Sequence, residues 1–332
     1  MNLEEVQARR LARARERELR IRRRRRVAAL TAVGLVAVIA VAVAVASSGG
    51  GSSAPRVASV RHGRGHSHAA TRKGVATGAT HSGSTVTGTP TGKPGTTPVP
   101  ILMYHVIAPP PPGAPFPGLY VPAPEFAAQM QALKSAGWHP VTLDQLEAYW
   151  TKGVPLGPGK PIVLTFDNGY HSQYANALPV LQQLHWVADE NMQLTGLPPS
   201  QGGLTTDEVK ALINAGWELD TQGISHADLV ALTPSELQAQ VASSRTTIKR
   251  EYGVPVNWFC YPSGHYNATV IAAVKAAGYV GSTTVIPGWA SPSSDPYRLP
   301  RLRVLGGTSP SALLAQIASA ESAAAPPPSY GS

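Results

Sequence analysis

The residues best suited to chemistry stand at the end of a short apolar run. Residues 161–166 (PIVLTF) are followed directly by Asp167, Asn168 and Gly169. A nearly continuous apolar run of this length indicates a buried parallel strand. Polar side chains at the carboxyl ends of parallel strands converge on the ligand, so Asp167 is a candidate catalytic residue. The alternative is an Asp-Asn-Gly loop that only begins a turn.

Strands and helices that would position Asp167 alternate along residues 98–322. We expect strands at 101–106, 139–142, 161–166, 186–193, 217–221, 257–261 and 279–284. We expect helices at 124–136, 143–150, 173–184, 205–215, 234–251 and 267–277. This alternation predicts an α/β fold in which helices cover a parallel sheet, and about seven strands favour a (β/α) barrel over two domains. The only cysteine, Cys260, lies in an apolar run and is expected to be a buried small hydrophobic residue.

Positive charge is concentrated ahead of this predicted domain. Residues 1–26 hold 11 Arg and 4 Glu, and residues 27–97 hold 6 Lys or Arg and no acidic residue. Residues 98–332 carry 11 basic and 15 acidic residues. Because the predicted folded part is mildly acidic, its composition argues against nucleic-acid binding by that part.

A membrane anchor is predicted at residues 27–46, which are uncharged and almost wholly Ala, Val, Leu and Ile. A helix of this length spans roughly 30 Å, the thickness of the bilayer's hydrocarbon core. The alternative is a cleaved signal peptide, since residues 44–46 (AVA) are small, although signal peptides normally have shorter apolar regions. The five consecutive Arg at 22–26 predict that residues 1–26 stay in the cytoplasm and that the remainder lies outside.

Two segments lack the apolar periodicity of a folded domain. Residues 47–97 are rich in Gly, Ser, Thr, Ala and Pro, and we predict a disordered linker. Residues 323–332 contain three consecutive Pro, and we predict a disordered tail. The expected folded domain is therefore 98–322.

Five segments of that domain resemble the polysaccharide deacetylase family, also called the family 4 carbohydrate esterases. They are PVPILMYHVI (98–107), LTFDNGYHSQYANALPVL (164–181), AGWELDTQGISHADLVALTPSEL (215–237), FCYPSGHYN (259–267) and DPYRLPRLRV (295–304). The resemblance implies a distorted (β/α) barrel of fewer than eight strands. It also implies removal of N- or O-acetyl groups from glycan polymers with the help of a divalent metal, often zinc.

The resemblance assigns roles to individual residues. Asp167 matches the general base, and Arg301 matches the arginine that orients this base. The metal ligands of the family are an Asp and two His, and their positions are taken here by Asn168, Gln222 and His226. Only His226 keeps the family's residue type.

The two exchanged ligands leave two functional hypotheses. Amide oxygens are weaker ligands for zinc than carboxylate or imidazole. An active enzyme would be a membrane-anchored deacetylase of cell-envelope polysaccharide with a divalent metal, zinc first, in which Asp220, His171 or His265 completes the ligand set. The alternative is a catalytically inactive glycan-binding pseudo-deacetylase that needs no metal. A purely structural envelope protein would leave Asp167 and His226 without a shared role.

Further residues follow from the same resemblance. Tyr261, Pro262, Ser263 and Gly264 match the family segment that lines the substrate groove. No His follows Arg301, so the late His that often supplies the family's general acid is missing. His105 and His265 remain as candidates for that role. The implied partner is an acetylated cell-envelope polysaccharide.

Overall fold

The structure, a computed structural model, describes residues 89–195, 197 and 202–331. The predicted cytoplasmic segment 1–26, the predicted anchor 27–46 and most of the predicted linker lie outside the described residues. Among the helices that are described, none is long and apolar enough to cross a membrane.

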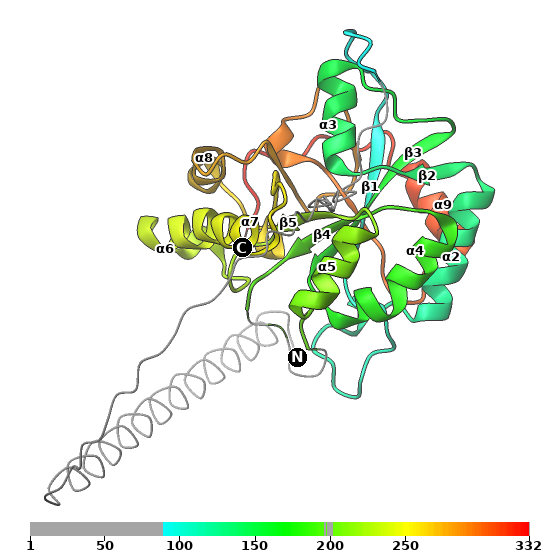
Figure 1. Cartoon of the computed structure of the whole chain (residues 1–332), viewed down its shortest axis with the longest axis horizontal. Coiled ribbons are helices and arrows are strands. Elements are labelled where there is room, and N and C mark those ends of the chain that lie inside the picture. Colours follow the sequence, from blue (N-terminus) through cyan, green and yellow to red (C-terminus); the bar gives the residue numbers. More distant parts are fainter. Residues whose placement is uncertain (1–88, 196, 198–201, 332) are drawn as a thin grey trace, which may run out of the picture. The chain divides into compact units, whose positions relative to one another are not determined.

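A curled, mostly parallel sheet forms the centre of the domain (Figure 1). Its strands follow the order β7-β6-β5-β4-β3-β1-β8, with β2 paired to β3 and β9 paired to β1. All pairings are parallel except that of β1 with β8. The strands are β1 (Val99–Tyr104), β2 (Trp138–Pro140), β3 (Lys160–Asn168), β4 (Asp189–Met192), β5 (Glu218–Thr221), β6 (Trp258–Cys260), β7 (Gly281–Thr283), β8 (Trp289–Ala290) and β9 (Leu302–Arg303).

The segment around β9 joins β7, at one end of this sheet, to β1, near the other end. Leu302 pairs with Leu102 of β1, and Leu299 bridges to Thr283 of β7. The Thr284 N–H donates to the Leu299 carbonyl (2.9 Å), and the Leu299 N–H donates to the Ser282 carbonyl (3.0 Å). The curled parallel sheet fits the predicted (β/α) barrel.

Helices surround the sheet, and α2 and α9 pack together on one side of it, away from α6, α7 and α8 (Figure 1). They are α2 (Ala123–Ser135), α3 (Leu143–Lys152), α4 (Leu178–Leu184), α5 (Thr206–Asn214), α6 (Pro234–Gln238), α7 (Ser244–Tyr252), α8 (Ala268–Ala276) and α9 (Pro310–Ser319). Helices α6 and α7 are joined through a π-helical turn, so the single helix predicted at 234–251 is interrupted. Helix α9 and strands β8 and β9 were not predicted.

Alternation along β3 decides which side chains reach the interior of the curled sheet. Leu164 and Phe166 pack into the apolar core beneath the helices, where the Phe166 ring lies 4.9 Å from that of Trp217. Because successive strand residues face opposite sides, Thr165 and Asp167 face the other way. The packing of Phe166 therefore fixes the direction of Asp167.

The folded domain begins earlier than predicted. Thr91 Oγ1 donates to the Gly153 carbonyl (3.1 Å), and the Gly95 N–H donates to the Tyr149 carbonyl (2.9 Å). The Trp150 indole donates to the Thr97 carbonyl (2.9 Å). The end of the predicted 47–97 linker, from Thr91 onward, thus packs on helix α3.

The end of the chain also differs from the prediction of a disordered tail. The Tyr266 N–H donates to the Tyr330 carbonyl (2.7 Å), and the Tyr330 N–H donates back (2.8 Å). The Tyr266 hydroxyl donates to the Pro327 carbonyl (2.7 Å), and Arg298 Nη1 donates to the Pro326 carbonyl (3.1 Å). The tail was misjudged because its backbone, rather than an apolar side-chain pattern, makes these contacts.

Candidate active site

A buried ion pair lies at the carboxyl end of β3. Arg301 Nη1 donates to Asp167 Oδ1 (2.7 Å), and Arg301 Nη2 donates to Asp167 Oδ2 (2.9 Å). Both side chains are buried, and Asp167 is 1% exposed. Arg301 also donates to Thr165 Oγ1 (2.9 Å) and to the Thr284 carbonyl (2.8 Å). The predicted pairing of Arg301 with Asp167 is thus present in the structure.

The surroundings of Asp167 keep its carboxylate ionised. Burial alone raises its pKa, but the charge and hydrogen bonds of Arg301 outweigh burial and lower the pKa to about 2. Asn191 Nδ2 also donates to Oδ1 (2.9 Å), and the Cys260 thiol lies 3.5 Å from Oδ2. Cys260 also lies 3.2 Å from Arg301 Nη2, so it belongs to a polar network and is not simply the small hydrophobic residue that was predicted.

Two residues that support Asp167 were not identified from the sequence. One is Asn191 of β4, and the other is Gln173, whose amide donates to the carbonyls of both His105 and Asp167 (2.9 Å each). Asn191 stands in the polar run 189–191, where a buried strand would normally be apolar. These polar residues in a buried strand are the sequence feature that could have indicated Asn191 as a site residue.

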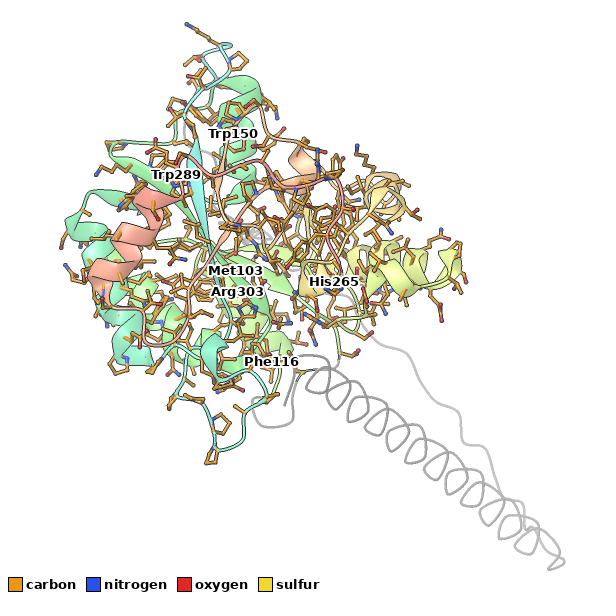
Figure 2. All side chains as sticks on the ribbon, turned by 180° about the vertical axis from the view of Figure 1, so that it is seen from behind. Met103, Phe116, Trp150, His265, Trp289 and Arg303 are labelled. Atoms are coloured by element: carbon orange, nitrogen blue, oxygen red, sulfur yellow. The ribbon has the colours of Figure 1, made fainter. Side chains whose placement is uncertain are left out.

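Asp167 opens onto a cavity of about 540 Å³. Sequence-predicted site residues that line it are Asp167, Asn168, Gln222, His226, Tyr261, Ser263, Gly264 and His105. Three further lining residues are labelled in Figure 2: Met103 of β1 and Arg303 of β9, which pair with each other, and Phe116 on the loop after β1. Segments distant in the chain thus converge on one cavity, whereas Arg301 lies behind Asp167 and Pro262 does not line it.

The three positions of the family's metal ligands present one imidazole and two amides. Asn168 Nδ2 donates to Gln193 Oε1 (2.8 Å), which leaves Asn168 Oδ1 as the group available for a ligand. Gln222 Oε1 is buried and has no hydrogen-bond partner. Burial lowers the pKa of His226, so its imidazole is neutral at pH 7. Zinc sites normally use about three imidazole, thiolate or carboxylate ligands, so this neutral, amide-rich set does not fit zinc.

None of the residues proposed to complete the metal set lines this cavity. Asp220 Oδ1 accepts hydrogen bonds from the backbone N–H of Asn257 (3.2 Å) and Trp258 (2.8 Å). His171 pairs with Glu208, and His265 pairs with Asp228. The Asp220 side chain turns toward the start of β6, and therefore it does not line the cavity beside Gln222.

His105 is the remaining titratable neighbour of Asp167. Its Nε2 lies 3.9 Å from Asp167 Oδ2. Burial lowers the pKa of His105 to about 4, although the Asp167 charge opposes part of this shift. The imidazole is neutral at pH 7, so it can accept a proton and cannot serve as the resting general acid.

Backbone conformation at the cavity is unusual. Four non-glycine residues of the described chain have left-handed φ, and three of them, Asn168 (82°), His226 (51°) and Ser263 (56°), line the cavity. A Cβ on Gly264 would lie 2.3 Å from a Val285 methyl carbon, so only glycine fits there. Strained residues of this kind cluster at functional sites.

Comparisons with known proteins point to one family. The polysaccharide deacetylase profile matches residues 156–282. YxkH of Bacillus subtilis, named as a polysaccharide deacetylase, is 32% identical over 221 residues, 67% of this chain and 76% of its own length. A poly-beta-1,6-N-acetyl-D-glucosamine N-deacetylase of Staphylococcus epidermidis is 26% identical over 196 residues, 54% of this chain and 66% of its own length. The deacetylase PplD of Streptococcus pyogenes, solved in complex with acetate, superposes with a TM-score of 0.61 at 27% identity, covering 68% of this chain and 99% of that chain.

Proposed function

The chain belongs to the polysaccharide deacetylase family, and we propose that it hydrolyses acetyl groups of a cell-envelope polysaccharide outside the membrane. One observation carries the proposal: a single cavity gathers Asp167, His226 and the groove residues Tyr261 and Ser263 at the carboxyl ends of the strands. In parallel α/β folds this end of the sheet is where ligands bind.

Hydrolysis requires that a proton leave the attacking water and that a proton reach the departing group, and a group that accepts the first proton can then donate it to the departing group. The ionised Asp167 carboxylate accepts the first proton, and Arg301 fixes its orientation through two hydrogen bonds. A carboxylate with a pKa of about 2 is a weak base. His105, 3.9 Å away and neutral, is the stronger base of the pair and shares this role.

The substrate class we propose is a polymer with N-acetylated sugars. The Staphylococcus epidermidis relative is named for poly-beta-1,6-N-acetyl-D-glucosamine. Phe116, at the cavity, is 69% exposed and lies between Pro115 and Pro117, which restrict its backbone. An exposed, rigidly held aromatic ring offers a stacking surface for a sugar ring next to the one being deacetylated.

The proposed location follows from the sequence. The apolar residues 27–46 would anchor the chain, and the arginines at 22–26 would hold the N-terminus in the cytoplasm. The domain would then meet envelope glycan on a linker of more than forty residues. Protease added to intact cells should release the domain; a chain that stays whole would contradict this topology.

Acetate release by the purified full-length protein tests the function. The substrates are poly-β-1,6-N-acetylglucosamine, chitin oligomers and peptidoglycan strands. We expect release by the native protein and by His171→Ala, whose side chain lies outside the cavity, and none by His226→Ala. Glycan binding without acetate release would instead support the pseudo-deacetylase alternative. If the native protein neither binds nor deacetylates any of these glycans, the proposal is wrong.

A further inference from the structure

A second group of ionisable side chains lies outside the cavity that Asp167 lines, which is the proposed catalytic cavity. Asp189 is the first residue of β4, and Glu218 and Asp220 are the first and third residues of β5. One carboxylate oxygen from each of the three lies within 4.8 Å of the others. Asp189 and Asp220 are completely buried.

In each of the three carboxylates, one oxygen accepts a hydrogen bond from the backbone and the other oxygen does not. Backbone N–H groups donate to Asp189 Oδ1 (Leu143, 2.8 Å), Glu218 Oε2 (Asp144, 3.0 Å) and Asp220 Oδ1 (Trp258, 2.8 Å). Asp189 Oδ2, Glu218 Oε1 and Asp220 Oδ2 are buried and accept no hydrogen bond from a donor group of the described chain. Glu218 lies within hydrogen-bonding reach of both Asp189 and Asp220, so a bound cation or a shared proton can satisfy these oxygens. The anchored oxygens fix the side chains, and a buried oxygen without a donor calls for a ligand.

Positive charge does not balance this group. None of the ion pairs in the described part of the chain involves Asp189, Glu218 or Asp220. The nearby Asp144 adds a fourth carboxylate, whose oxygens accept from Asn257 Nδ2 (2.8 Å) and Trp258 Nε1 (3.1 Å). Burial, together with the neighbouring carboxylates, raises the pKa of Asp189, Glu218 and Asp220. The N–H groups at the start of α3 offset only part of this negative charge.

We propose that Asp189, Glu218 and Asp220 bind a hard divalent cation, best matched by calcium, at a site separate from the catalytic cavity. Calcium–oxygen distances are about 2.3–2.6 Å, so two ligands on opposite sides of the ion lie about 4.8 Å apart. The three oxygens lie within 4.8 Å of one another, so one ion can contact all three. An all-oxygen, carboxylate-rich set selects calcium or magnesium over zinc.

A second cavity borders this site at Glu218. This cavity of about 260 Å³ is lined by Asp144, Glu218 and Trp217, among other residues. Water in this cavity can supply the remaining ligands that calcium requires. Trp217 on the cavity wall and Trp258, hydrogen-bonded to both Asp220 and Asp144, provide nearby indoles for a spectroscopic test.

Terbium is the probe, because it replaces calcium and emits when a nearby Trp is excited. The full-length protein, stripped with chelator, is titrated with terbium and then with calcium. We expect sensitised emission that calcium displaces, and a thermal midpoint that rises with calcium. Absence of both sensitised emission and a calcium-dependent shift would overturn the proposal, since the carboxylates would then be holding protons.

Amide variants separate cation binding from a purely structural role. Glu218→Gln and Asp189→Asn should weaken terbium binding at least tenfold, yet unfold no earlier than the native protein in chelator, because each removes a buried like charge. The exposed acids provide matched controls, Asp207→Asn and Glu251→Gln, and should bind terbium normally. His226→Ala should also keep the emission, which shows that the signal does not come from the catalytic cavity. Equal loss of emission in the control variants would refute the assignment.

Discussion

The ion pair between Asp167 and Arg301 gives Asp167 a structural role in addition to its proposed catalytic role. A residue that acted only as a general base could be replaced without loss of stability. In the structure, Asp167→Asn would remove the negative partner of a buried guanidinium that has no other charged partner among the described residues. We therefore expect this variant to lose stability together with acetate release.

Two independent estimates give the size of the effect. A pKa of about 2, against an ordinary 3.8, corresponds to roughly 2.4 kcal/mol of stability at neutral pH. Removal of one partner from a buried pair costs about 3–5 kcal/mol, since the other charge is left unpaired. For a domain of this size, 3–5 kcal/mol lowers the thermal midpoint by about 6–20 °C.

Chemical denaturation of four proteins would measure the coupling: the native protein, Asp167→Asn, Arg301→Met and the double variant. The double variant should be more stable than Asp167→Asn, because it leaves no buried charge behind. His171→Ala, at an exposed ion pair, is the control and should change stability by less than about 1 kcal/mol. Thermal denaturation of the native protein and Asp167→Asn completes the test, and a thermal midpoint for Asp167→Asn within 2 °C of the native value would refute the reasoning.

Three further predictions follow from other contacts. The Asp167 pKa is lowered on folding, so its stabilising contribution is full above about pH 4 and is lost as pH falls through about 2; denaturation as a function of pH should show this loss in the native protein and not in Asp167→Asn. Phe116→Ala should raise KM for polymeric substrate about tenfold and leave that for a small acetyl ester unchanged, whereas Phe116→Trp should keep the native KM; equal effects on both substrates would contradict a stacking role. Deletion of residues 326–332 removes four hydrogen bonds to Tyr266 and Arg298 and should cost about 1–3 kcal/mol in denaturation, and an unchanged midpoint would show that these contacts are dispensable.

The elements that sequence could predict are those with a strong local signal. The expected strand at 161–166 and helix at 124–136 match β3 and α2 to within two residues at each end. Strand β9 has two residues, and its identity comes from pairing with β1, about two hundred residues earlier. No local pattern carries that information.

The same distinction applies to the site. Asp167 and His226 were predicted from their motifs, and the structure places both at one cavity. The hydrogen bond from Asn191 and the contact with Cys260 depend on how β4 and β6 align beside β3, which the sequence does not state. The position of Asp220, one of three candidates to complete the ligand set, away from this cavity depends on the same alignment.

The distribution of charge inside the sheet decides where a cation can be held. At the cavity that Asp167 lines, Arg301 neutralises the Asp167 carboxylate, while Asn168 and Gln222 are neutral amides and His226 is an uncharged imidazole. The group formed by Asp189, Glu218 and Asp220 has three carboxylates and no paired cation among the described residues.

Restoring the family's ligands tests this view directly. The double change Asn168→Asp with Gln222→His adds a carboxylate and a second imidazole at the cavity that Asp167 lines. The zinc affinity should then rise at least a hundredfold, which corresponds to about 3 kcal/mol. In the native protein Gln193 Oε1 accepts a hydrogen bond from Asn168 Nδ2. The new carboxylate has no hydrogen to donate, so the Gln193 amide must flip to present its NH₂ group. Calorimetric titration with zinc should therefore show tight binding in the double variant and weak binding in the native protein. Calcium binding at Asp189, Glu218 and Asp220 should be the same in both. If the native protein already binds zinc at sub-micromolar concentration and His226→Ala abolishes that binding, the amides are adequate ligands and the charge argument is wrong.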